Sequence, residues 1–108
     1  MKIYIYLIIN KINCKMYVGI THNPEDRFYE HCHNAGYAIG KAIRKYNKEN
    51  FNFEILDHVD NYEYAGHLEQ LYILFLRTMV PGGYNLTAGG EKEKTFSEES
   101  VEKMRKTK

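Results

Sequence analysis

One carboxylate stands out among the residues that could do chemistry. Glu69 lies in a long stretch with helical spacing, and at about 100° per residue it shares one flank of that helix with Ala65 and Ile73. This flank is otherwise apolar, and an ionised carboxylate without a partner is costly in such surroundings. The sequence therefore predicts that Glu69 faces a cation or hydrogen-bond donors.

An arginine and a histidine form a second group of chemical interest. Asn23 and Pro24 mark the start of a helix, with Asn23 as the N-cap, and Arg27 and His31 lie one turn apart within it. The two side chains should therefore lie on one side of the helix, where a guanidinium can bind anionic oxygens as a planar fork. The alternative is an ordinary solvated helix face, with Glu30 close by.

Three tyrosines are expected on one face of a hairpin near the N-terminus. Apolar residues alternate with Tyr4 and Tyr6 in one segment and with Tyr17 and Gly19 in the next, which is the period of a β-strand. If the apolar sets pair on one face, the tyrosines gather on the other, and Gly19 leaves space beside them. The alternative is that these are β-favoured aromatics on a half-exposed sheet.

Histidines and cysteines also raise the question of zinc. His31-Cys32-His33 could combine with Cys14 or His22, but no CxxC or paired spacing supports a zinc site. A packed Cys32 and surface histidines are the preferred interpretation. Two cysteines cannot make a disulfide framework either.

These groups must be positioned by a small set of elements. Strands are expected over residues 3–9, 16–21 and about 51–56, and helices from Pro24 to near Ala35, from about Ala38 to Asn47, and from Asn61 to about Met79. Residues 10–15 form the hairpin turn, with Cys14 where an Asn-Gly turn would place glycine.

Two helices have predicted core stripes. In the first, Phe28, Cys32 and Ala35 form an apolar stripe beside Arg27. In the last, the spacing i, i+3, i+4, i+7, i+11 predicts a buried stripe of Leu68, Leu71, Tyr72, Phe75 and Met79.

Length and composition favour one small soluble domain. The 108 residues are 44% hydrophobic, and the pattern predicts a compact unit over residues 1–90 followed by a charged linker or tail over 91–108. No apolar run approaches the roughly 20 residues of a membrane helix. No secretory signal is recognisable, so a cytoplasmic protein with reduced thiols is expected.

The charge is divided unequally along the chain. Residues 1–48 carry eight basic and three acidic side chains, a net charge of +5, whereas residues 49–90 carry one basic and six acidic, a net charge of −5. A basic face could therefore meet a polyanion. Mutual neutralisation of the two halves in the fold explains the charges equally well.

The motifs resemble a known family. Tyr4-Ile5-Tyr6 and Tyr17-Val18-Gly19 resemble the paired signatures of the GIY-YIG nucleases, although Tyr4 stands at the first glycine position. The resemblance continues in the same order with Arg27-x-x-x-His31, Glu69 inside a long helix and Gly83-Tyr84-Asn85. It covers residues 3 to about 87.

This resemblance implies a fold and a reaction. The fold is a small α/β domain of the α+β type, a three-stranded antiparallel sheet flanked by helices, and the reaction is metal-dependent hydrolysis of DNA phosphodiester bonds. The implied catalytic residues are Tyr6, Tyr17, Arg27, His31, Glu69 and Asn85. Hydrolysis needs a deprotonated water, neutralisation of phosphate charge and help for the leaving oxygen.

Each implied residue has a chemical task. Glu69 would hold Mg²⁺ or Mn²⁺, and Arg27 would bind phosphate oxygens. Tyr6 or Tyr17 would deprotonate the water. Because a phenol has a pKa of about 10, it needs a neighbouring base or cation, for which His31 is the candidate.

Further residues are assigned to DNA or to the site with alternatives open. Asn85 lies against the active-site tyrosine or a phosphate in the family interpretation, which is favoured over a simple turn residue. Tyr37 is the best match to a further His or Tyr of the family, and Lys41 and Lys45 join it as candidate DNA-binding residues.

The tail has a second resemblance. Residues 95–104 resemble the opening of a modular DNA-binding motif found after GIY-YIG domains in homing endonucleases, with Ser97 as a helix cap. A charged tail without regular structure is an equal alternative.

The overall expectation is an endonuclease of the homing or mobile-element type. Its partner would be DNA, bound as a monomer or transient dimer, with no membrane and no small-molecule cofactor. The rivals are a non-catalytic nucleic-acid-binding module, which would leave Glu69 without a task, and a restriction or repair nuclease on the same fold.

Overall fold

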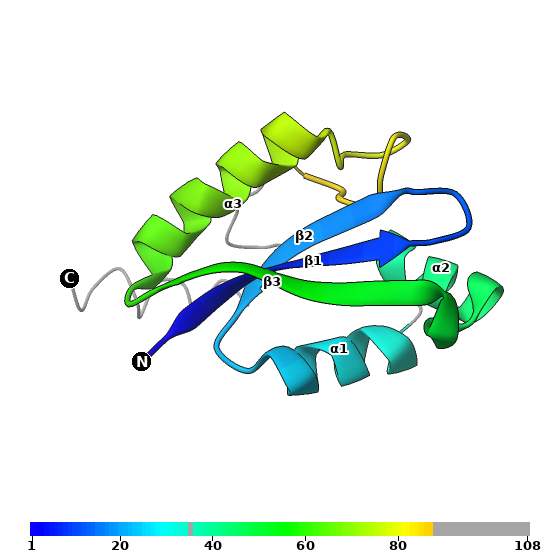
Figure 1. Ribbon diagram of the computed structural model, residues 1–108, viewed down its shortest axis with the longest axis horizontal. Coiled ribbons are helices and arrows are strands. Elements are labelled where there is room, and N and C mark those ends of the chain that lie inside the picture. The colour runs from blue at the N-terminus through cyan, green and yellow to red at the C-terminus, as the bar shows by residue number, and fades with distance from the viewer. Residues whose placement is uncertain (35, 88–108) are drawn as a thin grey trace.

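The computed structural model describes residues 1–34 and 36–87. Ala35, the end of the predicted domain at residues 88–90 and the predicted tail over 91–108 lie outside this described part. The elements are β1 (Ile3–Asn10), β2 (Met16–Thr21), α1 (Pro24–His33), α2 (Ala38–Tyr46), a 3-10 helix η1 (Lys48–Asn50), β3 (Phe51–Val59) and α3 (Tyr62–Leu76). The strands form the predicted three-stranded antiparallel sheet, and their order in it is β2-β1-β3 (Figure 1).

The hairpin turn between β1 and β2 is fixed by a buried asparagine. Asn10 is fully buried, its side-chain oxygen accepts from the backbone N–H of Ile12 at 2.8 Å, and its amide donates to the Tyr84 hydroxyl at 3.0 Å. Cys14 has a φ of 65°, the left-handed conformation that glycine adopts most easily. The predicted turn is therefore confirmed, with a cysteine in the position that favours glycine.

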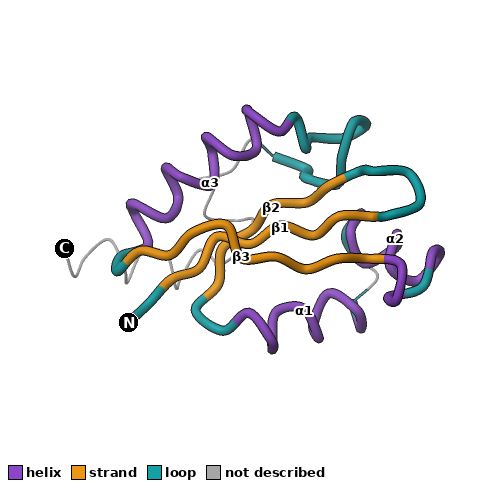
Figure 2. Tube along the Cα trace, viewed as in Figure 1, coloured by secondary structure: helices purple, strands orange, loops and turns teal. Residues whose placement is uncertain are grey.

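Both faces of the sheet are covered by helices. Figure 2 shows α3 and α1 on opposite sides of the strands. On the side of α3 the buried residues are aliphatic, and we call this set the aliphatic face: Ile3, Ile5, Leu7, Val18, Ile20, Ala65 and Ile73. On the side of α1 and α2 the set includes four large aromatics, and we call it the aromatic face: Tyr6, Ile8, Tyr17, Ile39, Ala42, Ile43, Phe51 and Tyr84.

The tyrosines are consequently less exposed than a one-sided sheet would leave them. Tyr6 and Tyr17 have 0% and 7% of their surface exposed, and Tyr4 is half-buried. The alternative of surface aromatics on a half-exposed sheet is therefore wrong for the first two.

The helix starts follow the predicted caps. The Asn23 side chain accepts from the backbone N–H of Asp26 at 3.2 Å, and Asn61 caps α3 by accepting from the N–H of Tyr64 at 2.7 Å. Side-chain oxygens at these positions satisfy N–H groups that the first turn leaves without a partner. The second helix begins at Ala38, as predicted.

The end and the core stripe of α3 differ from the prediction. The helix ends at Leu76, because Arg77 turns into the left-handed region with a φ of 57°. Leu71 and Phe75, two members of the predicted stripe, are 61% and 83% exposed. The helix is apolar on several sides, so spacing alone did not identify the side that packs against the sheet.

The residues actually buried on α3 lie on the flank that carries Glu69. They are Ala65, Glu69 and Ile73. Ala65 and Ile73 belong to the aliphatic face, so this flank of α3 is the one that packs against the sheet.

The segment after α3 folds back onto β2. The backbone N–H of Tyr84 donates to the Met16 carbonyl at 2.9 Å, and Asn85 and Thr78 are joined by a backbone bond of 2.8 Å. A side chain at Gly83 would overlap the carbonyl oxygens of Thr78 and Met16, so only glycine fits there. No helix in the described part of the chain has the length and apolar run needed to cross a membrane.

Candidate active site

Tyr6 lies at the centre of the aromatic face. It pairs across the hairpin with Gly19, and a Cβ at that position would overlap the Tyr6 hydroxyl and ring. The space that the sequence predicted beside Gly19 is therefore occupied by Tyr6 itself. The absence of a side chain at Gly19 lets the phenol ring lie over β2, an edge strand of the sheet.

The Tyr6 hydroxyl is bonded to His31 of α1. The hydroxyl oxygen and Nε2 are 2.8 Å apart, and His31 has only 6% of its surface exposed. Burial, together with the positive charge of Arg27, lowers the pKa of His31 to about 3. The imidazole is therefore neutral at neutral pH, and with its proton on Nδ1 it accepts the hydrogen bond that the phenol donates.

Tyr17 completes an aromatic cluster around this bond. Its ring meets His31 edge-on with centroids 5.1 Å apart, and it lies 6.1 Å from the ring of Tyr6. Burial raises the pKa of both phenols, well above the usual value for Tyr6, while hydrogen bonding and the charge of Arg27 lower both. Both phenols therefore keep their protons in the resting site. Either one can take a proton from water only if it passes its own proton to another group.

Arg27 lies where the cluster meets solvent. Its Nη1 donates to the Glu30 carboxylate at 2.9 Å, and 25% of its side chain is exposed. Burial lowers the pKa of Arg27, but its interactions with Tyr6 and Glu30 outweigh this and raise the pKa above its usual value. The guanidinium is thus a permanent positive charge. The alternative of a solvated helix face is wrong for His31, which is buried, whereas Arg27 does pair with the exposed Glu30 as that alternative expected.

Glu69 approaches the same tyrosines from α3. Its side chain is 1% exposed, and its negative charge raises the pKa of both Tyr6 and Tyr17. The predicted position of this carboxylate on the flank of Ala65 and Ile73 is confirmed. Glu69 is the carboxylate that an oxygen-seeking cation would meet beside the phenols.

The described residues show what kind of metal fits this donor set. Within residues 1–34 and 36–87, no three His, Cys, Asp or Glu side chains converge on one point. A single carboxylate is sufficient for Mg²⁺, which keeps several waters and takes further oxygens from phosphate. Cys32 packs against the aromatic face and burial raises its pKa, as the preferred interpretation of that residue predicts.

Asn85 differs from its sequence interpretation. Its amide is fully buried, where Oδ1 accepts from the Val18 N–H at 2.8 Å and Nδ2 donates to the Val18 carbonyl at 2.8 Å. The Thr78 hydroxyl donates to the same Oδ1 at 2.7 Å. Asn85 therefore holds the strand beside Tyr17 and contacts neither a tyrosine hydroxyl nor the pocket, so its predicted place against a tyrosine or phosphate is corrected.

Thr78 is a site-supporting residue that the sequence did not reveal. It is 1% exposed and its hydroxyl orients Asn85. A single threonine after a helix is ordinary in composition, so only the tertiary contact identifies it.

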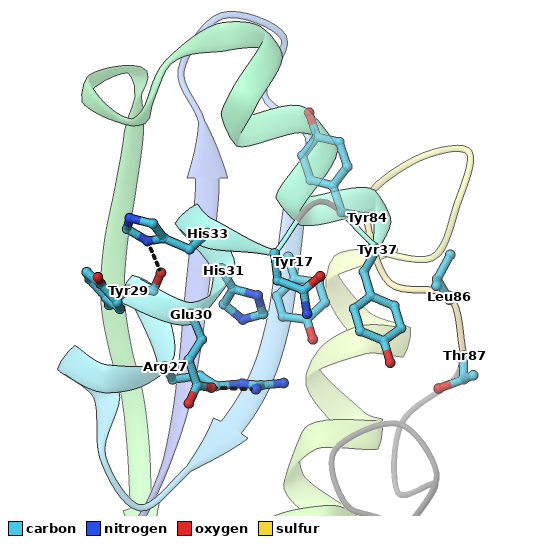
Figure 3. Close-up of a pocket in the computed structure, with 11 residues that line it drawn as sticks. Tyr17, Arg27, Tyr29, Glu30, His31, His33, Tyr37, Tyr84, Leu86 and Thr87 are labelled. Carbon is cyan, nitrogen blue, oxygen red and sulfur yellow. Dashed lines mark hydrogen bonds and ion pairs between the residues drawn. The ribbon is translucent and has the colours of Figure 1, made fainter.

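A pocket opens beside the cluster. Figure 3 shows Tyr37 and Leu86 on one side of Arg27 and His31, and Tyr29 on the other. Tyr17 lines this pocket, whereas Tyr6 does not. Tyr37, predicted to bind DNA, belongs to the lining, while the other two candidates, Lys41 and Lys45, are exposed on α2 outside it.

Comparisons with known proteins agree on one family. The family model described as the GIY-YIG catalytic domain matches residues 2–85. The putative endonuclease segB of Enterobacteria phage T4 is 37% identical over 90 residues, and endonuclease segA of the same phage is 34% identical over 88 residues. Each match covers 82% of this chain but 39% of the relative, so the chain spans about two fifths of the length of these relatives.

Solved structures share the fold. A mutant of the catalytic domain of intron endonuclease I-TevI matches with a TM-score of 0.71 and 24% identity, covering 90% of this chain and 100% of that one. A structure of the catalytic domain of homing endonuclease I-TevI matches with a TM-score of 0.66 and 23% identity, covering 77% of this chain and 96% of that one.

Proposed function

The chain belongs to the GIY-YIG family, and from that premise we propose that it is the catalytic domain of a DNA endonuclease that hydrolyses phosphodiester bonds with a divalent metal ion. The observation that carries the proposal is the buried bond between Tyr6 and neutral His31 beside an open pocket that Arg27 also lines. The charge of Glu69 acts on the same phenol by raising its pKa. A binding module has no use for a buried acid–base pair.

Glu69 is the residue proposed to hold the metal, Mg²⁺ or Mn²⁺. When bound, such an ion supplies positive charge to phosphate oxygens and to the leaving oxygen. The carboxylate is the donor type that these ions prefer, and its effect on the pKa of Tyr6 and Tyr17 supports a position next to the phenols.

The chain's own residues supply a path for the proton. Tyr17 faces the pocket and Tyr6 faces His31. We propose that a water in the pocket gives its proton to Tyr17 as Tyr17 gives its own to Tyr6 and Tyr6 gives its own to Nε2 of His31. The water oxygen then bonds to phosphorus as the bond from phosphorus to the leaving oxygen breaks, and the leaving oxygen takes a proton from solvent. Each phenol ends the step neutral, and His31 ends it protonated until it releases its proton to solvent.

Arg27 has two effects in this proposal. Its guanidinium binds the phosphate oxygens that gain negative charge in the transition state. Its charge also contributes to the low pKa of His31, so a phosphate bound at Arg27 offsets that charge and makes His31 a better base when substrate is present.

The wider assignment follows the names of the relatives. Both solved structures are of I-TevI, described as an intron or homing endonuclease, which supports the homing or mobile-element type. DNA as partner, action as a monomer or transient dimer, a cytoplasmic location, the domain limits 1–90 and a DNA-binding helix in the tail are parts of this proposal.

Cleavage of supercoiled plasmid tests the function. We expect nicked or linear product with Mg²⁺, no product with EDTA, and no product from Glu69→Gln, which keeps the shape of the side chain but removes its charge. Glu54→Gln is the matched control, because Glu54 is exposed on β3. Cleavage in EDTA, or wild-type cleavage by folded Glu69→Gln, would contradict the proposal.

A further inference from the structure

The pocket beside the active site is larger than a phosphate contact requires. Its volume is about 470 Å³, which lies within the range of about 300–1,000 Å³ for sites that hold small molecules. Tyr17, Arg27 and His31 line one part of it. The proposed hydrolysis needs only that part.

Beyond these residues the lining combines aromatic and apolar side chains with polar ones, and part of it is exposed. Tyr37 and Leu86 are each 51% exposed, and both line the pocket on the side beyond Tyr17 (Figure 3). Tyr37 is the N-cap residue of α2, but its side chain makes no capping hydrogen bond. The Tyr37 ring is therefore available for a ligand without loss of helix structure.

The opposite side of the pocket carries a second aromatic surface that is already ordered. The rings of Tyr29 and His33 are stacked with centroids 4.0 Å apart, and His33 Nδ1 is bonded to the Tyr29 carbonyl at 2.9 Å. Tyr29 is 64% exposed and lines the pocket. Flat, apolar surfaces thus lie on both sides of the guanidinium.

The distribution of charge in the pocket indicates its occupant. Arg27 supplies positive charge at the catalytic end, where one of its nitrogens, Nη1, is paired with Glu30, which also lines the pocket. The walls at Tyr37 and Leu86 are uncharged. A ligand that fits has a negative group at one end and a flat, uncharged ring at the other, which describes a nucleotide. Aromatic side chains bind such rings through stacking, whatever the base.

A base in an intact duplex cannot reach this surface. Paired bases are stacked inside the helix, so a nucleobase enters a pocket beside its own phosphate only when it is unpaired or leaves the stack. We infer that the pocket formed by Tyr37 and Leu86 binds one unstacked nucleobase next to the phosphate that is cut, so that DNA with an unpaired nucleotide there is the preferred substrate class. This inference rests on the proposed function, because it takes Arg27 as the phosphate site.

Binding by the full chain carrying Glu69→Gln tests the inference without cleavage. The probes are three labelled duplexes of one sequence: fully paired, with a single unpaired thymidine, and with an abasic residue in place of that thymidine. We expect about tenfold tighter binding of the duplex with the unpaired base than of the other two, since stacking of one base commonly has at least this effect. Equal affinity for all three would overturn the inference.

Substitutions locate the effect. In the same background, Tyr37→Ala should remove the preference and Tyr37→Phe should keep it, because only the ring is needed. Tyr64→Ala is the matched control, since Tyr64 is 54% exposed on α3 and does not line the pocket. Loss of the preference in Tyr64→Ala, or its persistence in Tyr37→Ala, would overturn the assignment to this pocket.

The two proposals fail in different ways. A preference for the unpaired base that depends on Tyr37, together with no plasmid cleavage by the protein that retains Glu69, would contradict the proposed function but support the pocket. Metal-dependent cleavage with no preference among the three duplexes would contradict the pocket alone.

Discussion

The two faces of the sheet have different tasks although both are buried. The aliphatic face under α3 contains branched side chains with no polar atoms, such as Ile5 and Val18. The aromatic face contains Tyr6, Tyr17 and the adjoining His31, each of which supplies buried area and a polar atom. An aromatic side chain with a hydroxyl can serve packing and chemistry together. The aliphatic face therefore provides stability, with Glu69 of α3 as the one buried residue on that helix assigned to the site. The aromatic face provides stability and the remaining residues of the site.

The largest expected effect comes from removing one oxygen atom from the aromatic face. Tyr6→Phe keeps the ring over Gly19 but deletes the hydroxyl bonded to His31. The cleavage rate should fall by about 10²–10⁴, the usual contribution of acid–base catalysis, while the free energy of unfolding falls by about 1 kcal/mol. Single-turnover cleavage and urea unfolding measure the two quantities.

Tyr4→Phe is the matched control for that change. Tyr4 lies on the same strand, with its ring 6.0 Å from that of His58, away from the cluster. Its rate should match the parent's. If the cleavage rate of Tyr6→Phe is within a few-fold of the parent's, the aromatic face contributes packing and takes no part in catalysis.

The aliphatic face should give the reverse result. Ile73→Ala deletes a side chain that is 2% exposed, which should lower the free energy of unfolding by about 2–5 kcal/mol with little change in the rate per folded molecule. Phe75→Ala on the same helix should change stability by less than about 0.5 kcal/mol, because Phe75 is 83% exposed. If both substitutions lowered the free energy of unfolding equally, Phe75 would be a core residue, as the spacing predicted.

The smallest expected effect is a pH dependence of stability from His31. An unfolded histidine has a pKa of about 6.5, and burial beside Arg27 lowers that of His31 to about 3. Between these values the unfolded chain binds more protons than the fold, so the stabilisation is complete above about pH 6.5 and is lost as the pH falls. About 2 kcal/mol should be lost by about pH 5.

Urea unfolding at neutral pH and at about pH 5 measures this loss, with His31→Gln as the comparison. The variant has no imidazole to protonate. Its free energy of unfolding should therefore fall by about 2 kcal/mol less than the parent's between neutral pH and about pH 5. Identical pH profiles for the two proteins would mean that His31 is not held neutral by the aromatic face.

Local signals made much of the fold predictable. Asn23 and Asn61 marked helix starts because a cap acts within one turn of its own residue. The alternation of apolar and other residues located the first two strands, because this pattern is also set by neighbouring residues. The third strand extends to Val59, beyond the expected end. Its pairing with β1 includes polar residues such as Glu54 and Asp57. Polar residues interrupt the alternation of apolar and polar positions, so the sequence did not predict the full length of this strand.

The site was predictable only where its residues are linked by local spacing or by the motifs of the family. Arg27 and His31 are one turn apart, so their common side follows from helix geometry. The partners of Asn85 do not follow from spacing, because Val18 lies 67 residues away in sequence. Two sides of α3 are apolar enough to be buried, and the sequence of the helix alone does not show which one packs against the sheet.

The return of the last described segment to β2 has a consequence for how the site forms. The bonds from Tyr84 to Asn10 and from Asn85 to Val18 join residues 74 and 67 positions apart, almost the whole length of the described domain. Contacts of such sequence separation carry a large loop-closure entropy and form late in folding. During synthesis Tyr6, Tyr17 and His31 leave the ribosome long before Asn85. A growing chain therefore lacks the hydrogen bonds between Asn85 and Val18 that hold β2 in place. We therefore expect the active geometry to arise only once the domain is fully made, and a partly synthesised chain to be harmless to nucleic acid around it.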